Sequence, residues 1–128
     1  MNIHKVSEIT GLSTYTLRYY EKVGLLHQIK KNASGIRQYS LQDISRIKFI
    51  KCMRDAEVSI KNLKTYIDLY DLSEDTFVLR KNLLKQEYAS MLDKYNKIRE
   101  GLEYLEKKVE LLEIDKLDSK LKKGGNIS

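Results

Sequence analysis

The residues of this sequence best suited to chemistry fall into two groups, a lone thiol and a run of cationic and phenolic side chains. Cys52 is the single cysteine among 128 residues. The run is Arg18-Tyr19-Tyr20-Glu21, and Gly24 follows it closely. Guanidinium and phenolic groups donate hydrogen bonds to phosphate oxygens, so the run predicts a surface that contacts an anion. A thiol in a suitable setting reacts with electrophiles or oxidants.

Two interpretations of Cys52 stay open at this point. A lone cysteine on a helix commonly serves as a small buried apolar residue. Lys48, Lys51 and Arg54 are close to it in sequence and would favour a reactive thiolate. A position near the carboxyl end of a helix opposes this, because the helix dipole there disfavours negative charge.

Catalytic and metal-binding arrangements are not recognisable in this sequence. It contains no nucleophile-base pair, carboxylate dyad or glycine-rich phosphate loop. Soft-metal sites need several thiolates or imidazoles, whereas Cys52, His4 and His27 are scattered. We therefore expect no enzymatic activity, no metal and no other cofactor.

Positive charge is concentrated in the first half of the chain. Residues 1–70 hold 12 Lys and Arg against 6 Asp and Glu, while residues 71–128 hold 12 of each. Because cationic side chains near phosphates release counterions, this pattern predicts a nucleic-acid-binding head joined to a neutral assembly element. No long apolar stretch, signal sequence or broad amphipathic face is present, which predicts a cytoplasmic protein without a membrane partner.

The arginine-tyrosine run is expected on the second of two short helices. Val6, Ile9 and Leu12 predict a first helix closed by Gly11. Ser13 is a suitable N-cap for a second helix over residues 14–22. Together they predict a helix-turn-helix, in which the second helix contacts DNA and its first residues read base edges.

A basic β-hairpin is expected next, with strands at residues 26–31 and 35–39 and a turn between them. Lys30, Lys31 and Arg37 would make it a wing that lies along a DNA backbone. Ser40 and Ser59 then predict the starts of two further helices. The third helix would bury an apolar face made of Ile44, Ile47, Ile50 and Met53.

A regular heptad pattern dominates the second half of the chain. Apolar residues alternate at spacings of four and three, which is typical of a coiled-coil seam and calls for a second chain to cover it. The row, named here the seam, is Leu84, Tyr88, Met91, Tyr95, Ile98, Leu102, Leu105, Val109 and Leu112. We expect this helix to end near residue 113 and a flexible tail to occupy residues 114–128.

Motifs in the first 70 residues resemble the signature of the mercury-resistance regulator (MerR) family. They are Thr10-Gly11-Leu12-Ser13, Thr16-Leu17-Arg18-Tyr19-Tyr20-Glu21, Gly24-Leu25-Leu26 and Gly35-Ile36-Arg37-Gln38-Tyr39. The resemblance implies a mainly α protein, with a winged helix-turn-helix head (residues 1–72) and a dimerisation helix (residues 73–113) in an antiparallel coiled coil. It also implies binding of double-stranded promoter DNA by a homodimer, which alters the DNA twist between half-sites so that RNA polymerase can use the promoter.

The resemblance assigns roles to individual residues. The expected DNA contacts are Thr14, Tyr15, Thr16, Arg18, Tyr19, Tyr20, Lys30, Lys31, Arg37, Tyr39 and Lys61. The chain is also similar to a subgroup with a single head-domain cysteine that responds to aldehydes or other electrophiles, which implies a sensing role for Cys52. Two alternatives stay open: an effector-independent repressor or architectural protein, and a coiled-coil adaptor whose basic head binds an acidic protein.

Overall fold

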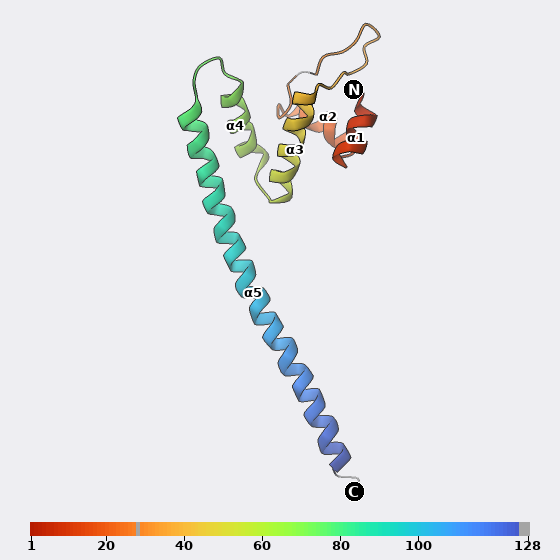
Figure 1. Cartoon of the computed structure of the whole chain (residues 1–128), viewed down its shortest axis with the longest axis vertical. Coiled ribbons are helices and arrows are strands. Elements are labelled where there is room, and N and C mark those ends of the chain that lie inside the picture. Colours follow the sequence, from red (N-terminus) through yellow and green to blue (C-terminus); the bar gives the residue numbers. More distant parts are fainter. Residues whose placement is uncertain (28, 126–128) are drawn as a thin grey trace. The chain divides into compact units, whose positions relative to one another are not determined.

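Five α-helices contain most of the residues that the computed structural model describes, which are residues 1–27 and 29–125 (Figure 1). The helices are α1 (Ile3–Thr10), α2 (Thr14–Lys22), α3 (Leu41–Asp55), α4 (Ile60–Asp71) and α5 (Phe77–Gly125). The chain divides into two compact units, Met1–Lys85 and Gln86–Ser128. Among the described residues, no helix is both long and apolar enough to cross a membrane.

Side-chain caps define where the helices of the first unit begin. Asn2, Ser13, Ser40 and Ser59 each accept a hydrogen bond from the backbone N–H three residues further on. At Ser40, the Asp43 carboxylate bonds back to the Ser40 backbone and completes a capping box. Each cap stabilises its helix by about 1 kcal/mol. The predicted starts at Ser13, Ser40 and Ser59 are confirmed.

The core of the first unit forms where α1 packs against α2 and α3, and α3 packs against α4. Ile44, Ile47 and Ile50 of α3 are buried, as their spacing predicted, whereas Met53 of the same predicted face is only half-buried. The apolar stripe predicted for the first helix is partly wrong, because Ile9 is 41% exposed. The buried stripe of α1 is instead Ile3, Val6 and Thr10, since the Thr10 hydroxyl is satisfied by the Val6 carbonyl.

The predicted β-hairpin is not formed, and residues 26–40 follow an extended loop without strands in the part that the structure describes (Figure 1). A single antiparallel bridge joins Lys31 and Arg37. Beside this bridge, the Asn32 N–H donates to the Ile36 carbonyl at 2.8 Å and the Gln38 N–H donates to the Lys30 carbonyl at 2.7 Å. At the tip, the Asn32 side chain accepts hydrogen bonds from two backbone N–H groups, and beyond Gln38 the backbone of Tyr39 exchanges hydrogen bonds with Met1. Residue 28 of the expected first strand lies outside the described residues.

α5 is a single helix of 49 residues. It continues well past the expected end at residue 113, so the predicted tail is wrong for residues 114–125, which are helical. This stretch contains residues of high helix propensity such as Leu117 and Leu121, and no proline interrupts it. Residues 126–128 of the expected tail lie outside the described residues.

Candidate nucleic-acid interface

One face of α2 is exposed and carries residues suited to a phosphate backbone. Tyr15, Arg18, Tyr19 and Lys22 occur at spacings of three and four and are all exposed, with Tyr15 at 78%. Residues at this spacing lie on one side of an α-helix. Lys22 was not among the predicted contacts, although its spacing from Arg18 and Tyr15 could have revealed it.

The opposite face of α2 holds the helix in the core. Leu17 is fully buried and Tyr20 is 6% exposed, and the Tyr20 ring lies 6.2 Å from that of Tyr19. The expected contact of Tyr20 with DNA is therefore not supported by this structure, because its spacing of three from Leu17 turns it inward. One tyrosine of the pair faces solvent and the other supports the head.

The first turn of α2 is fixed by its own cap. Thr14 and Thr16 are half-buried, and the Thr16 hydroxyl lies 2.9 Å from the Ser13 hydroxyl. Ser13 also accepts a hydrogen bond from the Thr16 backbone at 3.1 Å. Of the two predicted readers of base edges, Thr14 and Tyr15, Tyr15 is the more accessible, while Thr16 is engaged in the cap.

The loop of residues 26–40, named here the basic loop, is connected to α2 through an ion pair. The Nε of Arg37 donates to a carboxylate oxygen of Glu21 at 2.8 Å, and both side chains are largely shielded from solvent. Glu21 thus pairs with the loop, although Arg18 lies three residues before it on the same helix. Lys30 and Lys31 are exposed at the base of the loop tip. Arg37 retains further N–H donors on its guanidinium beyond the one that Glu21 uses.

Tyr39 is buried, at 3% exposure, which does not support its expected contact with DNA. Among the described residues its hydroxyl has no hydrogen-bond partner. Burial raises the pKa of this hydroxyl above its ordinary value of 10.0, and the Glu21 carboxylate raises it further. Tyr39 is thus a neutral core residue where the loop returns to the head.

The basic residues of α3 and α4 divide into engaged and free groups. The Lys51 ammonium donates to the Thr10 carbonyl at 2.7 Å, and Arg54 donates to the Val58 carbonyl at 2.9 Å. Lys48 and Lys61 are exposed. Lys61 therefore keeps the accessibility that a DNA contact needs, whereas Lys51 and Arg54 serve the interior of the head.

Cys52 is exposed on α3. The interpretation of this thiol as a small buried apolar residue is therefore wrong. Two of the cations that surround it in sequence, Lys51 and Arg54, point to backbone carbonyls elsewhere. Accessibility is the property that the structure adds to the case for a reactive thiol.

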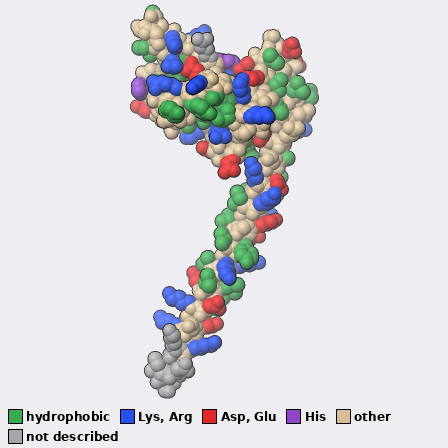
Figure 2. Space-filling model, turned by 180° about the vertical axis from the view of Figure 1, so that it is seen from behind, with side chains coloured by type: hydrophobic (Ala, Val, Ile, Leu, Met, Phe, Trp, Pro, Cys, Tyr) green, Lys and Arg blue, Asp and Glu red, His purple; other side chains and the backbone are tan. Residues whose placement is uncertain are grey.

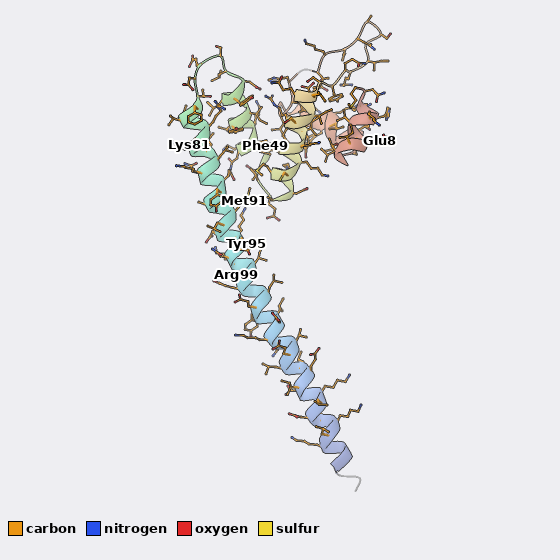
Figure 3. The ribbon with its side chains drawn as sticks, viewed as in Figure 1. Glu8, Phe49, Lys81, Met91, Tyr95 and Arg99 are labelled. Atoms are coloured by element: carbon orange, nitrogen blue, oxygen red, sulfur yellow. The ribbon has the colours of Figure 1, made fainter. Side chains whose placement is uncertain are left out.

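A pocket of about 200 Å³ lies between α3 and α4. Phe49 and Tyr66 line it with rings 5.6 Å apart, and Phe49 is carried by α3 (Figure 3). At its rim, Arg46 pairs with Asp71 at 2.7 Å and stacks over Tyr70. The pocket is smaller than the roughly 300 Å³ at which sites for drug-sized ligands begin.

The seam of α5 is exposed along the single chain. Apart from half-buried Met91, every member has at least 39% of its surface exposed, and Tyr88 reaches 70%. Apolar side chains recur along the face of α5 seen in Figure 2, and Met91 and Tyr95 lie on successive turns in Figure 3. Contiguous exposed apolar surface of this kind marks an association site.

Metal-ligating side chains do not gather within the described part of the chain. No group of three His, Cys, Asp or Glu residues there is placed to hold a metal ion. His27 instead lies 3.0 Å from Asp71 and 2.6 Å from an Arg46 nitrogen.

Short helices joined by a capped turn, one of them exposing tyrosines and an arginine, form the architecture of helix-turn-helix regulatory proteins. Among these, the chain belongs to the MerR family. The sequence model described as "MerR HTH family regulatory protein" matches residues 1–69.

Individual relatives agree with this assignment. The chain is 45% identical over 93 residues to the HTH-type transcriptional regulator AdhR of Bacillus subtilis (strain 168), a match that spans 73% of this chain and 66% of that protein. The fold is similar to a putative MerR family transcriptional regulator from Listeria monocytogenes, with a TM-score of 0.82, 36% identity, and coverage of 85% of this chain and 83% of that one.

A second similar structure contains DNA. It is HiNmlR, described as a MerR family regulator lacking the sensor domain, bound to promoter DNA. The TM-score is 0.77 at 26% identity, with 84% of this chain and 86% of that chain covered.

Proposed function

We propose that the protein is a homodimeric transcriptional regulator that binds promoter DNA through α2 and the basic loop. The observation that carries this proposal is the exposed face of α2, where Tyr15, Arg18 and Tyr19 stand together on a helix whose other side is locked in the core. Hydroxyl and guanidinium donors suit phosphate oxygens and base edges. The similarity to a family member bound to promoter DNA supports the same partner.

The proposed dimer forms through the seam of α5. A two-fold dimer presents its recognition helices to half-sites about 34 Å apart or at a multiple of that spacing. In this proposal residues 1–72 bind DNA and α5 holds the two heads in an antiparallel coiled coil. Changing the twist between half-sites costs a few kcal/mol, which backbone contacts from Lys30, Lys31 and Lys61 offset.

The proposal is tested by fluorescence anisotropy with a labelled duplex from the region upstream of the chain's own gene. We expect saturable binding, competition by the unlabelled duplex and much weaker competition by a scrambled duplex. The logarithm of the binding constant should fall linearly with the logarithm of the salt concentration, because phosphate contacts release counterions. An adaptor for an acidic protein would show no preference between the duplexes, and that result would overturn the proposal.

Cys52 is the proposed sensing residue, because it is the single thiol of the sequence and is exposed. Its sulfur adds to the carbonyl carbon of an aldehyde, the C=O π bond opens, and the thiol proton ends on the oxygen. The product is a thiohemiacetal, so no oxidant is required. Bulk added at this position of α3 would then alter the head.

Transcription in vitro tests this role with RNA polymerase, the promoter duplex and an aldehyde. The wild type should respond to the aldehyde, and Cys52→Ser should not, although both bind DNA equally in its absence. Mass spectrometry of the intact protein shows whether the adduct forms. An unchanged aldehyde response in Cys52→Ser would show that Cys52 is not the sensing residue. No aldehyde response in the wild type would leave an effector-independent regulator as the better description.

A further inference from the structure

Lys51 reaches from α3 to the turn of the helix-turn-helix. Its ammonium donates to the carbonyl oxygen of Thr10 at 2.7 Å, across 41 residues of sequence. Thr10 is the last residue of α1, and its carbonyl is one of the groups that a helix end leaves unpaired. A cation at the carboxyl end of a helix also interacts favourably with the helix dipole.

The turn itself is held by local hydrogen bonds on the α1 side. The Ser7 hydroxyl donates to the Leu12 carbonyl at 2.5 Å, and the Leu12 N–H donates to the Thr10 hydroxyl at 3.3 Å. These bonds shape the turn but connect it only to α1. The bond from Lys51 adds a connection to α3, a helix that also packs against α1.

Gly11 provides the space that this connection needs. Its φ is +73°, a backbone conformation that residues other than glycine rarely adopt. A Cβ built at Gly11 would lie 3.1 Å from the Lys51 nitrogen, which is tighter than an ordinary contact. The glycine is thus suited to this site both by its backbone conformation and by the room that it leaves for the ammonium.

We propose that Lys51 is a positioning residue for DNA binding. By tying the carbonyl end of α1 to α3, it fixes the direction in which α2 leaves the turn, and it makes no phosphate contact itself. This inference rests on the proposed function. It means that DNA binding depends on a residue that does not itself contact the DNA.

Salt dependence separates positioning from phosphate contact. Lys51→Met keeps most of the apolar stem and removes the ammonium; we expect it to weaken binding of the promoter duplex about tenfold, the order of one charge-assisted hydrogen bond. The slope of log affinity against log salt should stay at the wild-type value. The comparison variant Lys31→Met, at an exposed lysine of the loop, should reduce the magnitude of that slope by about one for each phosphate that the lysine neutralises. Lys51→Arg, which retains a donor and the charge, should recover much of the affinity.

A double-mutant cycle with Gly11→Ala tests the geometry directly. Gly11→Ala should cost less DNA affinity in the Lys51→Met background than in the wild type, because the crowding against the ammonium is gone and only backbone strain is left. Hydrogen exchange provides a readout without DNA: the amides of residues 11–13 should exchange faster in Lys51→Met, with protection in α4 unchanged.

Three results would overturn the inference. They are a reduced salt slope in Lys51→Met, additive effects in the cycle, and unchanged exchange in the turn. Failure of the wild type to bind any duplex is a different outcome, because it would remove the proposed function while the exchange experiment still tests the tie between Lys51 and the turn.

Discussion

The head and the long helix treat their apolar residues in opposite ways. In the head, Leu17, Ile47 and Ile50 are shielded within the single chain, whereas on α5 side chains such as Ile98 and Leu102 are more than 60% exposed. Exposed apolar area costs about 25 cal/mol for each Å² left in water. The head therefore has its own core, and α5 requires a second surface to cover its seam.

Polar groups differ between the two regions as well. In the head, polar contacts connect segments far apart in sequence: Arg37 pairs with Glu21, and Lys51 donates a hydrogen bond to the Thr10 carbonyl. On α5, the ion pair between Asp93 and Lys97 joins neighbouring turns of one helix. The comparison indicates that the head's geometry is set by contacts within one chain, while the helix obtains its place by association.

The largest effect is expected from charge introduced into the seam, which should separate the two chains without unfolding the head. Ile98→Asp with Leu102→Asp should give a monomer at micromolar concentration in sedimentation velocity. DNA affinity should fall by roughly 100-fold or more, because the two heads no longer bind as a linked pair. The control is Leu111→Asp with Ile114→Asp, exposed apolar residues outside the seam. Equal dissociation of the control would show that the seam is wrongly assigned.

A cavity in the core of the head should lower the stability of the head and leave the association through α5 intact. Ile47→Ala removes a side chain with 0% exposure, and we expect a loss of about 2–5 kcal/mol in the free energy of unfolding. Hydrogen exchange of the α3 amides measures this loss locally. The matched change Ile98→Ala should weaken the dimer and leave α3 protection intact. Similar loss of α3 protection in both variants would mean that head and helix do not have separate cores.

Local signals predicted the parts of the head that local chemistry determines. Ser13, Ser40 and Ser59 are capping residues whose effect is complete within three positions, so the sequence was sufficient to locate these helix starts. The helix-turn-helix followed from them and from Gly11, and its family was recognised from the same motifs.

Long-range contacts account for what the sequence did not reveal. The end of the loop is held at the head because Tyr39 exchanges hydrogen bonds with Met1, 38 residues away, and a local sequence pattern cannot show such a contact. The inward role of Lys51 depends on Thr10 in the same way. The continuation of α5 beyond residue 113 was missed for another reason: the heptad pattern ends there, but helix formation needs only suitable residues and not a seam.

The adjacent tyrosines of α2 sharpen the comparison within the head, since one faces solvent and the other the core. Tyr19→Phe should lower DNA affinity about fivefold, the order of one hydrogen bond to phosphate removed from each head. Tyr20→Phe is the matched control and should leave affinity near the wild-type value, because Tyr20 is 6% exposed. Anisotropy with the same duplex measures both. A larger effect at Tyr20 would reverse the assignment of the two faces.

The smallest effect is expected at Tyr39, a phenol buried in the head at 3% exposure. Its pKa is raised in the folded protein, chiefly by burial, so the folded state favours the neutral form. Stability from this preference is present below the unfolded-state pKa of about 10 and is lost as pH rises through the higher folded value. Tyr39→Phe should therefore lose less stability than the wild type between pH 8 and 11 in urea unfolding. At pH 7 the two should agree within about 1 kcal/mol, because the hydroxyl has no hydrogen-bond partner among the described residues. Parallel losses at alkaline pH would instead show that the phenol reaches water, and that the loop seals the head less tightly than its burial indicates.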